Sequence, residues 1–317
     1  NSIKIIGDNT DMYAQAYFDY DSKKSGGVTM SHLRFGKKPI KSTYLIHKAN
    51  FVACHNPSYV NKYNMVQELV DGGTFLLNCA WDMEGLEKHL PGQVKAFIAN
   101  HNIKFYTIDG VKIGIETGMG PTRINTILQS AFFKLTGIIP EDQAIDLMKA
   151  AAKATYGRKG DDVVQKNWAA IDAGAKQVVE IQVPESWKNA EDEGLHMTHA
   201  TEGRQDVIDF VNNIQAKVNA QEGNSLPVSA FKDYVDGTTP SGSAAYEKRG
   251  IAVNVPVWVP DNCIQCNRCA YVCPHAAIRP VAMTEAEAAA APEGMQYKDM
   301  TGMPGYKFAI TISAYDC

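Results

Sequence analysis

The chain has 317 residues, of which 45% are hydrophobic and 21% charged, values typical of a protein with at least one complete core. The formal net charge of −4 argues against a nucleic-acid partner or an anionic membrane surface. No apolar run reaches the roughly 20 residues that a membrane span needs, and no leader pattern is present. This length predicts two or three domains, and the abrupt ends at Asn1 and Cys317 predict a fragment.

In chain order, the first part alternates strand-like and helix-like segments. Strands are predicted at Ile3–Ile6, Ser42–Cys54 and Thr74–Cys79, and one helix at Met83–His101. Asp109-Gly110 is a turn signal that predicts a hairpin between Ile103–Ile108 and Val111–Glu116. Beyond it, Pro121 is expected at the first position of a helix that Gly137 ends.

Two more helices are predicted around Ala144–Ala151 and Val164–Val178. Strands mixed with covering helices favour an α/β domain built on a sheet. From about residue 185 the character changes: a helix over Val207–Val218 is followed by the Gly/Ser/Thr/Pro-rich stretch Asp236–Ser243, which predicts a linker. Val253–Pro260 is expected to be extended, because Pro256 and Pro260 do not fit a helix.

The strongest motif is a cysteine run at Cys263, Cys266, Cys269 and Cys273, followed by Pro274. Two-residue gaps in a tight loop let three thiolates reach one cubane iron–sulfur cluster, and the fourth Cys of such a run usually ligates a second cluster. Structural zinc is the competing interpretation, although it commonly uses two separated cysteine pairs. Cys317 is either the first Cys of a second run or a terminal free thiol. The run predicts an electron-transferring oxidoreductase.

A second constellation indicates an anion site. Lys23 and Lys24 precede two glycines, Gly26 and Gly27, which let a phosphate approach the backbone. Arg123 is expected in the first turn of the helix after Pro121, where a cation opposes the helix dipole unless an anion lies between them, and Asn125 adds a donor. The alternative is a solvated lysine pair and a surface arginine.

The remaining thiols and imidazoles favour ordinary structural roles. Cys54 and Cys79 lie at strand ends and are expected to be buried core residues. His196 and His199 are three residues apart, as in some metal sites, but no third ligand lies nearby. Seven cysteines, four of them clustered, do not form a disulfide framework, which predicts a reducing, cytoplasmic location.

Four further segments precede the cysteine run along the chain: Gly7–Asp11, Tyr20–Thr29, His32–Gly36 and Tyr246–Gly250. In this order, the segments and the cysteine run resemble the pyruvate:ferredoxin (flavodoxin) oxidoreductase family along essentially the whole chain. It implies an α/β gamma-like domain with a sheet covered by helices at residues 1–205. A Glu-Lys-Arg connector at 206–260 and the beginning of a two-cluster ferredoxin-like α+β domain at 261–317 follow.

The resemblance also implies a function, with pyruvate decarboxylated oxidatively on thiamine diphosphate and Mg²⁺ in domains absent from this chain. Electrons pass through three 4Fe-4S clusters to ferredoxin or flavodoxin, and coenzyme A leaves as acetyl-CoA. The gamma-like domain helps to hold coenzyme A, so Lys23, Lys24, Arg123 and Asn125 become candidates for its phosphates. A homodimer is implied for the full enzyme.

In the family pattern Cys263, Cys266 and Cys269 share one cluster with a Cys beyond this chain, and Cys273 shares the other with Cys317. Neither cluster is therefore fully ligated by residues 1–317. If the chain ends at Cys317, we expect residues 261–317 to be loose or metal-free, or Cys273 to complete a single rearranged cluster. The alternatives to a part of a pyruvate oxidoreductase are a stand-alone electron-transfer and coenzyme A-binding module and a component acting on another 2-oxoacid.

Overall fold

The computed structural model describes residues 2–21, 27–191, 199–248 and 250–317. The chain divides into two compact units, Asn1–His196 and Met197–Cys317. The first unit is built on a four-stranded sheet in the order β3-β4-β5-β6. Its strands are β3 (Ala49–Cys54), β4 (Leu69–Asn78), β5 (Lys104–Ile108) and β6 (Val179–Glu180). The first three run parallel, and β6 pairs antiparallel with β5.

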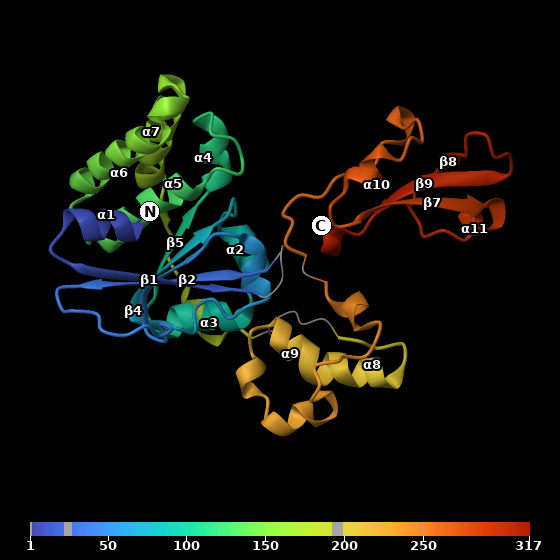
Figure 1. Ribbon diagram of the computed structural model, residues 1–317, viewed down its shortest axis with the longest axis horizontal. Helices are drawn as coiled ribbons and strands as arrows, with labels where there is room; N and C mark the ends of the chain where they lie inside the picture. The colour runs from blue at the N-terminus through green and yellow to red at the C-terminus, as the bar shows by residue number, and fades with distance from the viewer. Residues whose placement is uncertain (1, 22–26, 192–198, 249) are drawn as a thin grey trace. The chain divides into compact units, whose positions relative to one another are not determined.

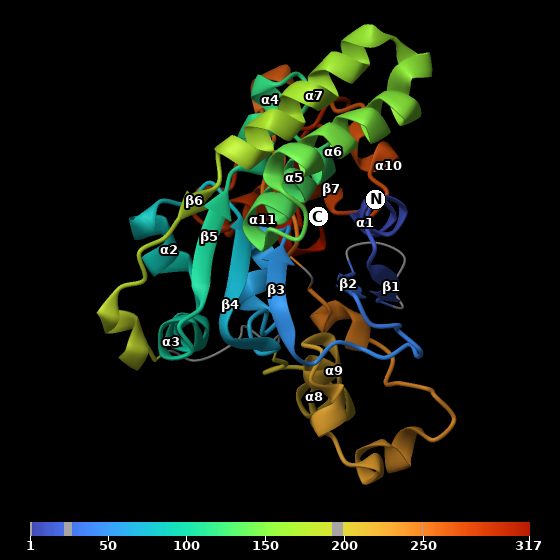
Figure 2. The same ribbon diagram turned by 90° about the vertical axis from the view of Figure 1, so that its left-hand side faces the viewer.

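Helices cover both faces of this sheet (Figure 1, Figure 2). In β4, Phe75 and Leu77 pack with α2 (Met83–His89), α3 (Gly92–Asn100) and Trp187. Leu76, between them, packs on the opposite face with α4 (Gly110–Glu116), α5 (Asn125–Thr136) and α7 (Asp161–Lys176). A parallel strand covered on both faces is apolar at consecutive positions, which is why the run around Phe75 carries no alternation. The predicted α/β architecture is confirmed.

A third core joins the N-terminal segment to the helical layer. The helices α1 (Ser2–Asn9) and α6 (Glu141–Tyr156) contribute Ile5, Ile6 and Met148 to one cluster, together with Phe133 of α5. The strands β1 (Tyr13–Tyr20) and β2 (Thr29–Gly36) form a separate antiparallel hairpin, which the sequence pattern did not predict. The described part of this unit also contains short 3₁₀ turns at Pro57–Asn61, Gly157–Lys159 and Glu185–Asn189.

The predicted strand at Ile3–Ile6 is wrong, because these residues lie in α1. Ile5 and Ile6 are neighbours and both are buried, whereas a strand would send them to opposite faces. Asn9 and Thr10 donate side-chain hydrogen bonds to the carbonyls of Ile5 and Ile6, at 2.9 and 2.6 Å. These bonds satisfy acceptors that the end of the helix leaves free.

The predicted strand at Val111–Glu116 is also wrong, and Asp109-Gly110 is not a hairpin turn. Asp109 is the N-cap of α4, and its carboxylate accepts a hydrogen bond from the Lys112 amide at 2.9 Å. Aspartate is as favourable at a helix N-cap as in a tight turn, so the dipeptide alone does not distinguish the two.

Three predicted boundaries are corrected. The single helix at Met83–His101 is two helices, because Pro91 disfavours helical geometry at Leu90 and ends α2 there. The strand predicted from Ser42 begins only at Ala49. The helix expected from Pro121 begins at Asn125, after a turn in which Gly118 and Gly120 have φ of 73° and 84°. Its end at Gly137 is confirmed, with φ of 59°.

In the second unit, the predicted helix around Val207–Val218 is confirmed as one continuous segment. It comprises α8 (Gln205–Phe210), a π-helical turn (Val211–Gln215) and α9 (Ala216–Asn219). Val207, Phe210 and Ile214 pack in its small core with Tyr234 and Tyr246. Short 3₁₀ turns follow at Gly223–Ser225, Val228–Tyr234, Ser243–Tyr246 and Pro260–Asn262.

The rest of the second unit is a three-stranded antiparallel sheet with two short helices. The strand order is β7 (Ile278–Thr284), β9 (Tyr306–Ile312) and β8 (Lys298–Asp299). Helix α10 (Arg268–Val272) precedes β7, α11 (Glu285–Ala289) follows it, and a 3₁₀ turn spans Ala314–Asp316. Among the described residues, no helix combines the length and the apolar composition that crossing a lipid bilayer requires.

Candidate functional site

The cysteine run lies in a loop and a short helix that lead into β7. Cys263 follows the 3₁₀ turn Pro260–Asn262, Cys269 lies in α10, and Cys273 ends that helix. Gln265 and Asn267 have positive φ values of 59° and 58°, which turn the loop sharply on either side of Cys266. Such conformations are unfavourable for residues other than glycine, so other contacts must stabilise this loop.

Two long-range side chains hold the loop. Lys298 of β8 donates hydrogen bonds to the carbonyls of Pro260 and Cys263, at 2.9 and 3.0 Å. The Gln265 amide group donates to the Asp299 carbonyl at 2.7 Å and accepts from the Thr301 amide at 2.8 Å. The first two cysteines of the run are therefore anchored to the β8 segment, more than thirty residues later in the sequence.

The sulfur atoms have environments suited to thiolate ligands. Cys263 Sγ accepts a hydrogen bond from the Gln265 amide at 3.4 Å. Backbone hydrogen bonds, first from Ile278 and then from His275, lower the pKa of Cys273. Cys266 and Cys269 are exposed, whereas Cys263, Cys273 and Cys317 are half-buried. Backbone amides directed at cysteine sulfur are a common feature of iron–sulfur loops, so the donor chemistry fits a 4Fe-4S cluster.

The side chains are not arranged as a closed metal cage. Within the described ranges, no group of three or more His, Cys, Asp or Glu side chains is placed to hold a metal ion. The loops that carry the cysteines are defined by their backbone conformation and by the polar contacts of Gln265 and Lys298.

The structure describes only part of the predicted anion site. Arg123 and Asn125 are exposed near the N-terminus of α5, which has no side-chain cap. Arg123 precedes the helix rather than lying in its first turn, because the helix starts later than predicted. Lys23 and Lys24 lie outside the described residues.

The isolated thiols are core residues, as predicted. Cys54 and Cys79 are 1% and 7% exposed at the carboxyl ends of β3 and β4. Burial raises the pKa of Cys54 to about 12 and that of Cys79 to about 11, so both remain thiols. His199 is exposed, and His196 lies outside the described residues. Because Cys54 and Cys79 are packed in the core of the first unit, we do not assign them as cluster ligands.

The sequence pattern missed the residues that organise the cysteine loops: Gln265, Arg279, Lys298 and Asp316. Gln265, Arg279 and Lys298 make hydrogen bonds to partners 34 to 38 residues away in the sequence. Asp316 also accepts a hydrogen bond from Lys248, 68 residues away. No local motif marks such contacts. One hint of their role is present in the sequence: Gln265 and Asp316 lie within two residues of a cysteine.

Three family models match successive parts of the chain. One described as "Pyruvate ferredoxin/flavodoxin oxidoreductase" matches residues 2–177. EKR, a "Domain of unknown function", matches residues 198–252, and a "4Fe-4S binding domain" matches residues 255–278. The last of these contains the whole cysteine run.

Curated proteins match the chain over its entire length. A pyruvate-flavodoxin oxidoreductase of Enterobacter agglomerans is 51% identical over 317 residues, and a pyruvate:ferredoxin oxidoreductase of Moorella thermoacetica is 52% identical over 319. A pyruvate dehydrogenase [NADP(+)] of Cryptosporidium parvum is 45% identical over 341 residues. Each match covers 100% of this chain, but only 26%, 26% and 18% of the respective relatives. The chain therefore spans about a quarter or less of their length.

Proposed function

Because the chain belongs to the pyruvate ferredoxin/flavodoxin oxidoreductase family, we propose that it is the central part of an enzyme that oxidatively decarboxylates pyruvate. One observation carries the proposal: the cysteine run is joined, within one chain, to a domain that matches this family over residues 2–177. Two relatives named as a pyruvate-flavodoxin and a pyruvate:ferredoxin oxidoreductase are 51% and 52% identical to this chain over its full length, which supports the proposal.

The proposed reaction converts pyruvate and coenzyme A into acetyl-CoA and CO₂, and releases two electrons and one proton. Thiamine diphosphate and Mg²⁺ act in domains outside these 317 residues. Each 4Fe-4S cluster supplies a one-electron redox centre, so the two electrons leave in separate steps. This chain provides thiolate ligands from Cys263, Cys266, Cys269, Cys273 and Cys317, and its loops shape the surroundings of those ligands.

We propose three domains with different roles. Residues 1–205 form the gamma-like domain that contacts coenzyme A, and residues 206–260 form the Glu-Lys-Arg connector. Residues 261–317 begin the ferredoxin-type domain that holds two clusters in the full protein. The Gln265 and Lys298 contacts support the last assignment, since they hold the cysteine loop to the sheet.

For coenzyme A we propose Lys23, Lys24, Arg123 and Asn125 as phosphate contacts. Arg123 and Asn125 are exposed beside a helix N-terminus without a side-chain cap, where amide groups are free to bind an anion. Arginine and lysine are the usual partners of phosphate oxygens.

The proposed partners are ferredoxin or flavodoxin as electron acceptor, the rest of the same polypeptide, and a second copy of it in a homodimer. The acceptors named for the relatives support the first, and the coverage of about a quarter supports the second. A cytoplasmic location is proposed from the cluster chemistry, because thiolate ligands persist in a reducing compartment.

Steady-state assays of the full-length polypeptide test this function. We expect acetyl-CoA and reduced flavodoxin or ferredoxin from pyruvate, with dependence on thiamine diphosphate and coenzyme A. Residues 1–317 alone should give neither, which separates a part of an enzyme from a stand-alone module. A much higher kcat/KM for another 2-oxoacid would reject pyruvate as the substrate, and thiamine-dependent dye reduction by residues 1–317 alone would reject the division of domains.

A further inference from the structure

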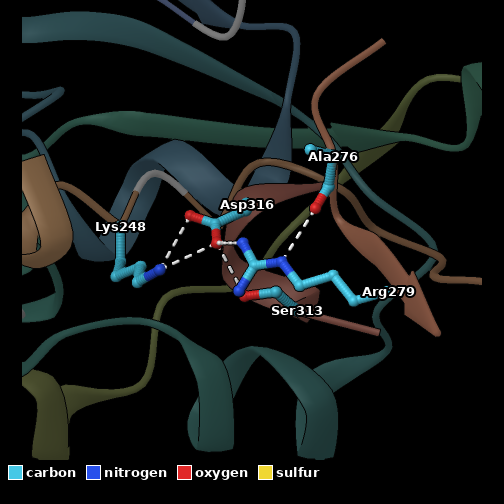
Figure 3. A network of polar contacts seen from close by, with 5 residues as sticks. All are labelled: Lys248, Ala276, Arg279, Ser313 and Asp316. Carbon is cyan, nitrogen blue, oxygen red and sulfur yellow. Dashed lines mark hydrogen bonds and ion pairs between the residues drawn. The ribbon is translucent and has the colours of Figure 1, made fainter. Parts of the chain in front are cut away.

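Asp316, the residue before Cys317, accepts hydrogen bonds from three side chains (Figure 3). Lys248 Nζ lies 2.7 Å from Asp316 Oδ2 and 3.0 Å from Oδ1. Ser313 Oγ donates to Oδ2 at 2.7 Å, and a guanidinium nitrogen of Arg279 donates to the same oxygen at 3.3 Å. The Asp316 side chain is 20% exposed and that of Lys248 35%, so water screens this contact less than an ordinary surface ion pair.

Arg279 extends the network to the turn that follows Cys273. Its Nε donates to the carbonyl of Ala276 at 2.9 Å. Ala276 has φ of 51° and donates its own amide to the Cys273 carbonyl at 3.3 Å, which closes the turn. One guanidinium therefore joins the turn after Cys273 to the carboxylate before Cys317.

The sheet brings these two turns to the same end. The pairing of β7 with β9 starts at Ile278 and Ile312, and Ser313 continues it by donating its amide to the Ala277 carbonyl at 2.8 Å. Cys273 precedes Ile278 by five residues, and Cys317 follows Ile312 by five. The antiparallel ladder thus brings the segments that lead to Cys273 and Cys317 to the same end of the sheet, while the turns beyond the ladder need separate support.

That support comes from the EKR segment, which has no assigned function. Lys248 lies in it and is 68 residues from Asp316 in the sequence. The segment contacts the same turn a second time through its backbone, because the Gly250 amide donates to the Tyr315 carbonyl at 2.8 Å. Two successive residues before Cys317 are therefore held from outside the sheet.

We propose that Lys248 is a positioning residue of the EKR segment, which acts through Asp316 and Arg279 to hold the turns of Cys273 and Cys317 at the spacing of one iron–sulfur cluster. This inference rests on the proposed function. Cluster ligands must converge on a small cube, so a loose turn before Cys317 raises the rate at which that cluster is lost. The ammonium group also adds positive charge near the cluster, which makes its reduction potential less negative.

The test compares full-length holoprotein variants by the rate at which a ferrous-iron chelator removes cluster iron under anaerobic conditions. In Lys248→Met, about four irons per chain should leave about fivefold faster, which corresponds to about 1 kcal/mol, while the other irons leave at the wild-type rate. The potential of one cluster should also become more negative. Lys248→Arg should behave like the wild type, because it retains the charge and the donors. Lys232→Met is the matched control, since it removes an exposed positive charge from the same segment.

A double variant tests whether Lys248 acts through its ion pair with Asp316. Lys248→Met combined with Asp316→Asn should lose iron no faster than the faster single variant, because both remove the same interaction. If Lys248→Met gives no holoprotein, Lys248→Gln, which retains donors without charge, serves in its place. Wild-type chelation kinetics in Lys248→Met, equal acceleration in Lys232→Met, or additive single effects would overturn the proposal. The assay needs no substrate, so a cluster-containing protein that does not oxidise pyruvate contradicts only the proposed function, whereas a wild type without clusters contradicts both.

Discussion

At the scale of single residues, the cysteine loop is held by side-chain hydrogen bonds to the β8 segment. Lys298 donates to the carbonyls of Pro260 and Cys263, and the Gln265 amide group donates to the Asp299 carbonyl. Because the four cysteines at 263, 266, 269 and 273 have the spacing of a cubane ligand run, these contacts fix the loop in which the proposed thiolate ligands lie.

The proposed coenzyme A site gives a prediction for Lys24. In the full-length enzyme, Lys24→Ala should raise the KM for coenzyme A about tenfold and that for pyruvate much less, since a charge-assisted hydrogen bond to phosphate contributes about 1.5–3 kcal/mol. Arg123→Ala should act in the same direction. Lys41→Ala, which removes an exposed lysine elsewhere, is the control. Unchanged coenzyme A dependence in both site variants would reject the assignment.

A second residue-scale prediction concerns Trp187, which is 1% exposed and packs against β5 and α3. Its indole Nε1 donates to the Glu87 carboxylate at 2.5 Å. Trp187→Ala should reduce the free energy of unfolding of the first unit by about 3–5 kcal/mol through the cavity it creates. Trp187→Phe should reduce the free energy of unfolding by less, because an aromatic ring still fills most of the space. The Glu87 carboxylate, whose side chain is 58% exposed, replaces the lost hydrogen bond with one to water. Urea denaturation followed by circular dichroism measures both, and equal losses would contradict a packing role.

At the scale of elements, the sequence correctly predicts the helices whose hydrophobic periodicity fits only one kind of secondary structure. The helices α6 and α7 have amphipathic periodicity and form as predicted. The predictions for Ile3–Ile6 and Val111–Glu116 are wrong, because a largely apolar segment of only four to six residues fits a strand or a helix equally well. In both cases the deciding contacts are made by caps: Asn9 and Thr10 at the end of α1, and Asp109 at the start of α4.

Close packing of α5 against α7 gives an element-scale prediction. A Cβ on Gly174 would lie 2.5 Å from the carbonyl oxygen of Ile127, a backbone atom that cannot turn aside. Gly174→Ala should therefore destabilise the first unit by about 1–3 kcal/mol, even though alanine is the better helix former. Gly157→Ala at the end of α6 is the matched control, because no atom lies within 4 Å of its added Cβ. Denaturation midpoints that move together in the two variants would refute the packing argument.

At the scale of the whole molecule, the order of segments predicted more than any single motif. Residues 2–177, 198–252 and 255–278 match three family models in the order that the resemblance implied. The sequence did not predict that Lys248 would bond to Asp316, since that contact joins the EKR segment to a turn residue 68 positions away. Long-range polar contacts of this kind depend on the folded backbone, and periodicity carries no information about them.

Ligand counting gives a whole-molecule prediction for residues 1–317 prepared anaerobically as an isolated polypeptide. Cys263, Cys266 and Cys269 supply three thiolates to one cluster, and Cys273 with Cys317 supply two to the other, whereas a 4Fe-4S cluster takes four. Iron and sulfide analysis should therefore give near zero iron. About four irons per chain would indicate a single rearranged cluster, and about eight would contradict the count.

We propose that this chain carries electrons released from pyruvate, and reduction of its iron–sulfur clusters by pyruvate is the decisive observation. The anaerobic full-length protein, supplied with thiamine diphosphate and Mg²⁺, is mixed with pyruvate and coenzyme A while the visible absorbance of its iron–sulfur clusters is recorded. We expect the absorbance to bleach on mixing and to return when oxidised ferredoxin or flavodoxin is added. Clusters that dithionite bleaches but pyruvate with coenzyme A leaves oxidised would contradict it.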